Sequence, residues 1–298
     1  MLKIRKIKSS DKDRVTEITK DIWDGDDYMP LVFDKWVKEK TGEFVGAVDE
    51  KGKLIGFEKL TMVTEKDAWI EGLRKDMNSE IKGVGIFLSN YLIKLAKAKK
   101  VNTIRFTTYF QNVESISLFS KIGFEIIERR NNKFKEIPKI KFIPEYKGNR
   151  SEIIKDEKLA LDYFHRSKSA KLLNNGINIS WVLHPITDKL ITDKFVKTDQ
   201  CLGIIENGEI KALSFFMIRE KDELFISYFF ADNDKYAKEL FQKLKQITYK
   251  NKQKYMNIII HLKDKECNQW FKQFGFTSWE EENDFMLFDL PIKQKGNK

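Results

Sequence analysis

Two glycines, Gly83 and Gly85, stand one residue apart where a segment with helical spacing of leucines begins. Because glycine is a poor helix former, both positions weaken the first turn of the predicted helix, which indicates that this turn needs bare backbone. The first N–H groups of a helix lack intrahelical partners and, together with the helix dipole, attract anions. Glycine lets an anion approach closely, and Lys82 adds a positive charge beside it. The pattern favours a phosphate-binding turn, although tight turns and helix caps use glycine too.

One carboxylate, that of Glu71, interrupts the otherwise apolar predicted strand WIEGL. Burial raises the pKa of a glutamate towards neutrality, which suits a general base that takes a proton from an amine. The alternative is an ion pair between Glu71 and a lysine at a sheet edge. We predict that Glu71 is the catalytic base.

The segment IWDGDDYMP at residues 22–30 gathers acidic and aromatic side chains between two predicted helices. Asp26 and Asp27 supply negative charge for a cationic amine, and Tyr28 supplies an aromatic face for the same cation. Arg74 could bind a carboxylate through two hydrogen bonds. An acceptor with both groups, such as an amino acid, would use both features. The alternative is an Asp-rich turn that caps the next helix.

The remaining composition argues against several other kinds of site. The two cysteines, Cys201 and Cys267, form no CxxC or CxxH pattern and the three histidines are widely separated, so we predict no metal site. No Ser-His-Asp or Cys-His arrangement is visible, so we expect a reaction without an enzyme nucleophile. The formal net charge of +10 is spread along the chain, without the basic run of a nucleic-acid-binding tail. The N-terminus lacks the apolar core of a signal peptide and no apolar run could span a bilayer, so we expect a cytoplasmic protein that binds neither nucleic acid nor membrane.

The chain contains the same order of predicted elements twice. Residues 44–67 and 201–222 both read as two strands joined by a turn that contains glycine, which is a hairpin signal. Each pair is followed by a third apolar strand, a helix with leucine on one face, a further strand and a short amphipathic segment that ends in Gly-Phe. The offset between the copies stays nearly constant, so the pattern predicts two related α/β domains, 1–143 and 144–298, joined near residues 140–150.

This order of elements, with two motifs, resembles the GNAT superfamily of acyl-CoA-dependent N-acyltransferases. The family signature Gln/Arg-x-x-Gly-x-Gly/Ala is similar to Glu80-Ile81-Lys82-Gly83-Val84-Gly85, with glutamate in the first position. The family's second segment, Asn-x-x-Ala-x-x-Leu-Tyr-x-Lys-x-Gly-Phe, is similar to NVESISLFSKIGF at residues 112–124. The resemblance implies tandem GNAT-like domains of the α/β (α+β) class, each a mixed, mostly antiparallel sheet with a splayed parallel strand pair, flanked by helices. It implies that the first domain is catalytic and the second degenerate.

The resemblance also implies where acetyl-CoA, the co-substrate, binds. In this family the glycine turn receives the pyrophosphate of coenzyme A, and the pantetheine arm pairs with the preceding strand, here Trp69–Lys75. The residues expected to contact the cofactor are Leu73, Lys75, Lys82, Gly83, Val84, Gly85, Ile86, Asn112 and Phe119. Phe119 stands where the family has the tyrosine that serves as acid, so Tyr109 is our candidate for the catalytic acid, with Tyr28 as a second. The family needs no metal.

The loop Gly25-Asp26-Asp27-Tyr28-Met29-Pro30, together with EGLR at residues 71–74, resembles a GNAT subgroup that includes vertebrate histidine α-N-acetyltransferase. This resemblance implies that Asp26, Asp27, Tyr28 and Arg74 bind the acceptor. We therefore predict an acyl-CoA-dependent N-acetyltransferase that moves an acetyl group to the amine of a small molecule such as an amino acid. The amine would attack directly in a ternary complex, with Glu71 as the base.

The second copy lacks the glycine turn, because ADNDKYAKEL stands in its place. Asp232 and Asp234 look like helix caps and would repel a phosphate, so we expect this half not to bind CoA productively. Two alternatives to the predicted function stay open: a GNAT relative that binds CoA or another ligand without turnover, and a tandem-GNAT aminoacyl or long-chain acyltransferase. No pattern in the sequence indicates an oligomeric state.

Overall fold

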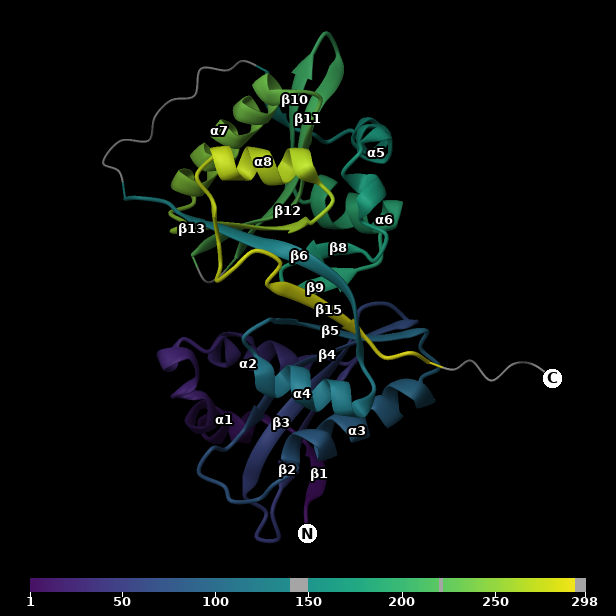
Figure 1. The fold of residues 1–298 in the computed structure, drawn as a ribbon, viewed down its shortest axis with the longest axis vertical. Coiled ribbons are helices and arrows are strands. Elements are labelled where there is room, and N and C mark those ends of the chain that lie inside the picture. Colours follow the sequence, from purple (N-terminus) through teal and green to yellow (C-terminus); the bar gives the residue numbers. More distant parts are fainter. Residues whose placement is uncertain (140–149, 220–221, 293–298) are drawn as a thin grey trace, which may run out of the picture. The chain divides into compact units, whose positions relative to one another are not determined.

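The computed structural model describes residues 1–139, 150–219 and 222–292, which form two compact units (Figure 1). One unit comprises Met1–Glu128 and the segment that starts at Leu287, and the other comprises Arg129–Met286. The chain therefore passes into the second unit within strand β6 (Glu125–Glu136) and returns within β15 (Phe285–Asp289).

The predicted ranges 1–143 and 144–298 differ from these compact units, because they assume that the chain crosses between the units only once. The return through β15 joins the last described residues to the first unit. The junction predicted near residues 140–150 falls almost wholly on residues 140–149, which lie outside the described ranges.

The first unit is built on one mixed sheet. Along the chain its elements are β1 (Lys3–Lys6), α1 (Lys12–Thr19), α2 (Met29–Lys38), β2 (Glu43–Val48), β3 (Leu54–Met62), β4 (Asp67–Lys75), α3 (Val84–Ala98), β5 (Thr103–Tyr109), α4 (Val113–Ile122) and the start of β6. The strand order is β1-β2-β3-β4-β5, with β15 beyond β5. The pairs β1–β2, β2–β3 and β3–β4 are antiparallel, and β4–β5 is parallel. The predicted mixed, mostly antiparallel sheet is therefore confirmed.

The parallel strands β4 and β5 separate after their first residues. Their register runs only from Asp67 opposite Thr103 to Trp69 opposite Arg105, whereas β4 continues to pair with β3 as far as Lys75. Beyond Trp69, the edge of β4 that faces β5 has no strand partner among the described residues. The splayed parallel pair predicted for this fold class is present.

Helices cover both faces of this sheet. Glu58 and Lys59 are neighbours in β3 and therefore point to opposite faces. Ser89 of α3 donates a hydrogen bond to Glu58, and the Trp36 ring of α2 lies 5.4 Å from the Lys59 ammonium. Helix α3 thus packs on one face and α2 on the other. On the α2 face the buried core comprises Ile7, Val15, Ile18, Met29, Phe33, Trp36, Phe44, Val48, Leu54 and Phe57.

The second unit repeats much of this order. Its elements are the end of β6, β7 (Ser151–Ile153), α5 (Glu157–Arg166), β8 (Ile177–Ile179), β9 (Val182–His184), α6 (Asp188–Ile191), β10 (Cys201–Glu206), β11 (Glu209–Arg219), β12 (Glu223–Ala231), α7 (Asp234–Lys250), β13 (Tyr255–His261), α8 (Lys265–Gln273), β14 (Thr277–Ser278) and the start of β15. The strand order is β6-β13-β12-β11-β10-β7, and β8 pairs with β9 apart from it. The parallel pair β12–β13 also ends early, at Ile226 opposite Ile258. None of the helices in the described ranges combines the length and the apolar character needed to cross a bilayer.

The N-terminus of α7 differs from the sequence-based expectation. Asn233, and not an aspartate, caps the helix, because its side chain accepts the N–H of Tyr236 at 3.2 Å. Asp234 accepts a hydrogen bond from the Trp270 indole at 2.7 Å, and Asp232 is likewise engaged by a side chain, the Tyr163 hydroxyl at 3.0 Å. The prediction that the two aspartates cap this helix is therefore wrong, since both turn towards aromatic side chains.

Candidate active site

A β-bulge in β4 organises the candidate site. Phe57 of β3 lies opposite Arg74, and Lys59 lies opposite Glu71, so β4 contains one residue more than β3 between these two pairs. In a regular strand, Glu71 and Arg74 would point to opposite faces because they are three residues apart. The extra residue in β4 shifts the alternation of side chains by one position, so Glu71 and Arg74 both point to the face covered by α2.

Gly72 makes the bulge possible. Its φ of +70° lies in the left-handed region that favours glycine. A Cβ atom at this position would lie 2.6 Å from two carbon atoms of the Trp36 ring. Both the backbone conformation and the close packing of Trp36 therefore require glycine.

Glu71 is partly buried among polar groups on this face. Its side chain is 20% exposed, and the Lys59 ammonium lies 4.0 Å from its Oε1 atom. The Thr61 hydroxyl donates a hydrogen bond to the same oxygen. Burial raises the pKa of Glu71, while the Lys59 charge and the Thr61 hydrogen bond oppose that rise. The structure thus contains the lysine pairing that the sequence left open, in a setting that also raises the pKa of the carboxyl.

Arg74 and the loop before α2 form the second part of this face. The Arg74 Nε atom donates to Asp27 Oδ2 at 2.7 Å, and Nη1 donates to the Leu73 carbonyl at 2.9 Å. Its guanidinium lies 4.7 Å from the ring centre of Trp23 and 5.4 Å from that of Tyr28. The Nη2 atom is buried and has no acceptor in hydrogen-bond geometry among the described residues, although the Tyr28 phenol is close enough to raise the pKa of Arg74.

Asp27 differs from its predicted role. Its side chain is 2% exposed, and Oδ1 accepts the N–H of Met29 at 2.8 Å at the start of α2. Arg74 neutralises the Asp27 carboxylate, and both carboxylate oxygens already accept hydrogen bonds within the protein. Asp27 is therefore poorly placed to bind an amine. Asp26 is exposed. Burial raises the pKa of Tyr28 to about 12, although the Arg74 charge opposes the rise.

The turn before α3 has the properties expected of an anion site. Gly83 adopts a φ of +76° and no side chain caps the helix. Phe87 is the first residue whose N–H bonds back to this turn, at 3.0 Å to the Gly83 carbonyl. The N–H groups of Val84, Gly85 and Ile86 donate to no acceptor within the described ranges. Lys82 is exposed beside them.

Packing gives a separate reason for glycine at position 85. A Cβ atom there would lie 2.6 Å from Leu118 Cδ1 and 3.3 Å from Leu73 Cδ2. Its bare backbone therefore permits the close packing of α3 against these two leucines. At Gly83, in contrast, no atom of the described residues lies within 4 Å of the added Cβ.

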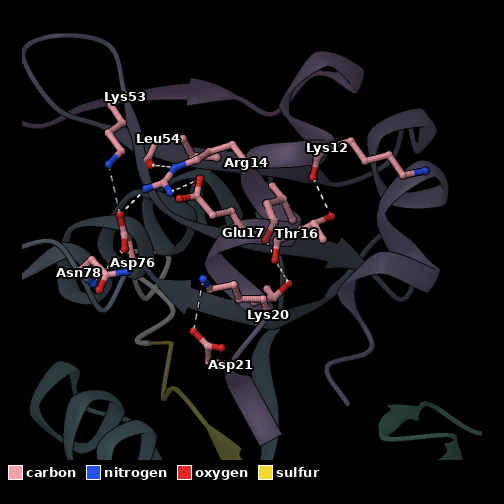
Figure 2. Close-up of polar contacts among 12 residues, drawn as sticks. Lys12, Arg14, Thr16, Glu17, Lys20, Asp21, Lys53, Leu54, Asp76 and Asn78 are labelled. Atoms are coloured by element: carbon pink, nitrogen blue, oxygen red, sulfur yellow. Dashed lines mark hydrogen bonds and ion pairs between the residues drawn. The ribbon is translucent and has the colours of Figure 1, made fainter. Parts of the chain in front are cut away.

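The start of the same turn is fixed by the ion pair between Asp76 and Arg14 (Figure 2). Lys53 approaches the Asp76 carboxylate to 3.9 Å, and the N–H of Asn78 donates to it at 2.9 Å. Arg14 is itself held by the Leu54 carbonyl at 3.0 Å. Helix α1 thus determines where the turn leaves β4.

Two of the predicted residues, Asn112 and Phe119, lie in structural positions. Asn112 caps α4, accepting the N–H of Ser115 at 3.2 Å, and its amide donates to Thr108 at 2.9 Å. Phe119 is only 3% exposed, with its ring centre 4.1 Å from that of Phe106. Phe119 therefore belongs to the core. The prediction that it contacts the pantetheine arm does not fit this burial. Tyr109 ends β5 and is partly exposed.

The backbone positions predicted for pantetheine, Leu73 and Lys75, lie on the part of β4 that has separated from β5. Lys75 pairs with Gly56 on the other edge of β4. The Leu73 carbonyl is partly used by Arg74. These positions leave the β5-facing edge of the strand open.

The residues around Glu71 were missed by the sequence-based prediction. Lys59 is 1% exposed, and its ammonium is 2.9 Å from Glu39. The signal was present in LIGFEKLTM, where a glutamate and a lysine stand side by side in an otherwise apolar strand. A strand buried on both faces admits such residues only when they are paired.

A cavity of about 700 Å³ lies in the second unit and includes none of the predicted site residues. It is lined by the ends of α5 and β12 and by parts of α7 and α8, with Tyr163, Phe230 and Trp270 as aromatic walls. Three acidic and three basic side chains also line it. Across the described ranges, no three His, Cys, Asp or Glu side chains cluster as metal ligands would.

Comparison with known proteins agrees with the fold. Residues 1–138 match the family model described as an acetyltransferase (GNAT) domain. A search of curated proteins found no match. The match covers 138 of the 298 residues, and this first part of the chain is similar to a GNAT acetyltransferase domain.

Solved structures extend the likeness along the chain. A GCN5-related N-acetyltransferase from Sphaerobacter thermophilus is 11% identical with a TM-score of 0.68, covering 97% of this chain and 95% of that one. A tandem GNAT protein from the clavulanic acid biosynthesis pathway is 11% identical with a TM-score of 0.65, covering 97% and 98%. A putative acetyltransferase from Pyrococcus horikoshii is 15% identical with a TM-score of 0.57, covering 98% and 90%. At these identities the likeness concerns the fold alone.

Proposed function

We propose that the first unit is an acetyl-CoA-dependent N-acetyltransferase that acts on the amine of a small molecule such as an amino acid. The observation that carries this proposal is the bulge at Gly72, because it brings Glu71 and Arg74 to one face of β4. That face adjoins the strand edge left open by the splay from β5. A base, a carboxylate-binding group and an open backbone edge are thus supplied by one strand.

The turn at Lys82–Ile86 would hold the pyrophosphate of acetyl-CoA, with the free N–H groups of α3 as donors. The open edge of β4 near Leu73 and Lys75 would pair with the pantetheine arm. The bound thioester supplies the acetyl group. Gly83 tolerates a ligand close to its backbone because its surroundings are empty.

Glu71 would take the proton of the acceptor amine as its nitrogen attacks. A carboxyl whose pKa is raised by burial suits this task near neutral pH. A backbone N–H of β4 near Leu73 would stabilise the developing negative oxygen, a contribution of about 10²–10³ in rate for such a donor. Tyr109 remains our candidate for the group that returns a proton to the thiolate.

Arg74 would bind the acceptor's carboxylate through its guanidinium, and this binding requires the side chains that bury Nη2 to move aside. Trp23, which is 46% exposed, adds an aromatic surface beside it. Asp27 would hold Arg74 in position, since it binds Nε directly. This arrangement favours acceptors with a carboxylate near the amine, which is consistent with the resemblance of the Asp26–Pro30 loop to the histidine α-N-acetyltransferase subgroup.

The test is an assay of thiol release from acetyl-CoA, with the standard amino acids and simple amines without a carboxylate as separate acceptors. We expect turnover with one or more amino acids and a large loss with the matching decarboxylated amine. Glu71→Gln should lower turnover by about 10²–10⁴ without changing the dissociation constant of acetyl-CoA measured by calorimetry. Turnover at the wild-type rate in Glu71→Gln would refute the base assignment. Tight binding of acetyl-CoA without transfer to any acceptor would instead favour a ligand-binding relative.

A further inference from the structure

Glu71 Oε1 is the end of a short chain of hydrogen bonds that begins at a buried lysine. The Lys59 ammonium donates to Thr61 Oγ1, and the Thr61 hydroxyl donates to Glu71 Oε1. Lys59 is 1% exposed, and Trp36 covers it with its ring centre 5.4 Å away. These four residues come from β3, β4 and α2, so the arrangement depends on the fold and not on one local segment.

The chemistry of the groups fixes the direction of this chain. A protonated lysine has only donors, so the Thr61 oxygen must accept from it. A hydroxyl has one hydrogen, and with Lys59 on the oxygen that hydrogen is directed to Glu71. The Thr61 oxygen could accept from both Lys59 and a protonated Glu71 only if its own hydrogen turned away from Glu71, whereas in the structure that hydrogen is donated to Oε1. Oε1 is therefore held as an acceptor, while Oε2 makes no hydrogen bond within the described ranges.

Other charged groups around Glu71 act in both directions. Glu39 shares the Lys59 ammonium at 2.9 Å and raises the pKa of Glu71 through its own charge, whereas Lys35 of α2 lowers it. Tyr28, in the loop before α2, is close enough for the Glu71 charge to raise the pKa of its phenol. Lys59 outweighs Lys35 and Thr61 among the groups that favour the ionised carboxylate.

We propose that Lys59 and Thr61 are positioning residues that hold Glu71 ionised at rest and leave its Oε2 atom to take the proton of the acceptor amine. This inference rests on the proposed function for its catalytic meaning. The proton leaves the amine nitrogen as the N–C bond forms and is added to Oε2, so no further reactant is needed. Without the chain, burial would favour the protonated form of Glu71, which cannot act as a base.

The first measurement does not depend on turnover. Protein labelled with ¹³C at the glutamate carboxyl is titrated by NMR, and the Glu71 signal is assigned by its loss in Glu71→Gln. An opposite charge at this range lowers a carboxyl pKa by about 1–3 units, so Lys59→Met should raise the Glu71 midpoint by about that amount. Thr61→Val, which keeps the shape and removes the hydroxyl, should raise it by a smaller amount. Thr61→Ser, which keeps the hydroxyl, is the matched control and should titrate as the wild type does.

The second measurement is the pH profile of kcat/KM for thiol release in the same variants. The acidic limb should move to higher pH by the shift seen in the NMR titration, and Thr61→Ser should restore the wild-type profile. Titration midpoints of Glu71 that stay unchanged in both Lys59→Met and Thr61→Val would overturn the inference. If Lys59→Met does not fold, the comparison of Thr61→Val with Thr61→Ser decides the question. Shifted midpoints without any turnover would reject the proposed function, whereas turnover with an unshifted profile would reject the role of Lys59 and Thr61 alone.

Discussion

Replacing Gly72 by alanine tests whether the bulge depends on this glycine. The left-handed φ of +70° costs an alanine about 1–2 kcal/mol, and the loss of backbone freedom in the unfolded chain returns about 0.4–1 kcal/mol. The Cβ atom would also lie 2.6 Å from the Trp36 ring, and overpacking of this kind costs about 1–3 kcal/mol. Together these terms predict that Gly72→Ala loses about 2–4 kcal/mol of unfolding free energy.

Gly52→Ala is the matched control, because Gly52 has a similar φ of +81° and an added Cβ would meet no atom of the 1–139, 150–219 and 222–292 ranges within 4 Å. It should lose only about 1 kcal/mol, from the backbone terms alone. Urea unfolding measures both losses. In a Trp36→Phe background, which removes the ring atoms in the way, the loss caused by Gly72→Ala should fall to that of the control. Equal losses for Gly72→Ala and Gly52→Ala with Trp36 in place would refute the close-packing argument.

Three further predictions concern the turn before α3 and the two faces of the sheet. Acetyl-CoA at a hundred times its dissociation constant should stabilise wild type and Gly83→Ala by about 2.7 kcal/mol in thermal melts, and an equal effect in Gly83→Glu would contradict the anion site. Burial raises the pKa of Asp76, but Arg14 and the Asn78 N–H outweigh burial and hold the pKa below its ordinary value. The Asp76 carboxylate should therefore stabilise the fold fully above about pH 4 and less as the pH falls further. Thermal melts of wild type and Asp76→Asn across pH would measure this difference. Burial raises the pKa of Glu58 to about 8, although the Ser89 hydrogen bonds oppose the rise. The folded state therefore keeps a proton that the unfolded chain releases near pH 4.3, so the stability of wild type should fall from about pH 5 to pH 8. Stability should change less with pH in Glu58→Gln, and identical slopes in the two proteins would contradict this prediction.

The order of strands and helices followed from local signals in the sequence. Turn glycines, apolar strands and leucine spacing mark each hairpin and each long helix, because those features depend on neighbouring residues only. The crossings between units in β6 and β15 carry no such signal. They depend on pairing between segments that are distant along the chain, as in the hydrogen bond from the Leu290 N–H to the Ile104 carbonyl at 2.9 Å.

The candidate site was predictable in part for the same reason. Glu71 and the glycine turn stand out because a carboxylate in a strand and two glycines before a helix are locally unusual. The pairing of Asp27 with Arg74 and the chain from Lys59 to Glu71 arise only when β3, β4 and the loop before α2 are brought together. Phe119 was assigned by its place in a motif, and its burial against Phe106 could not be read from that place.

The most direct test of the central claim is product analysis after incubation of the purified chain with acetyl-CoA, carrying ¹³C in its acetyl group, and a mixture of amino acids. The account predicts an amino acid that carries the labelled acetyl group on its amine, formed by wild type and reduced by about 10²–10⁴ in Glu71→Gln. Formation of the labelled product at the same rate by both proteins would contradict Glu71 as the base. Binding of acetyl-CoA with no labelled amine at any pH would contradict the proposed transfer itself.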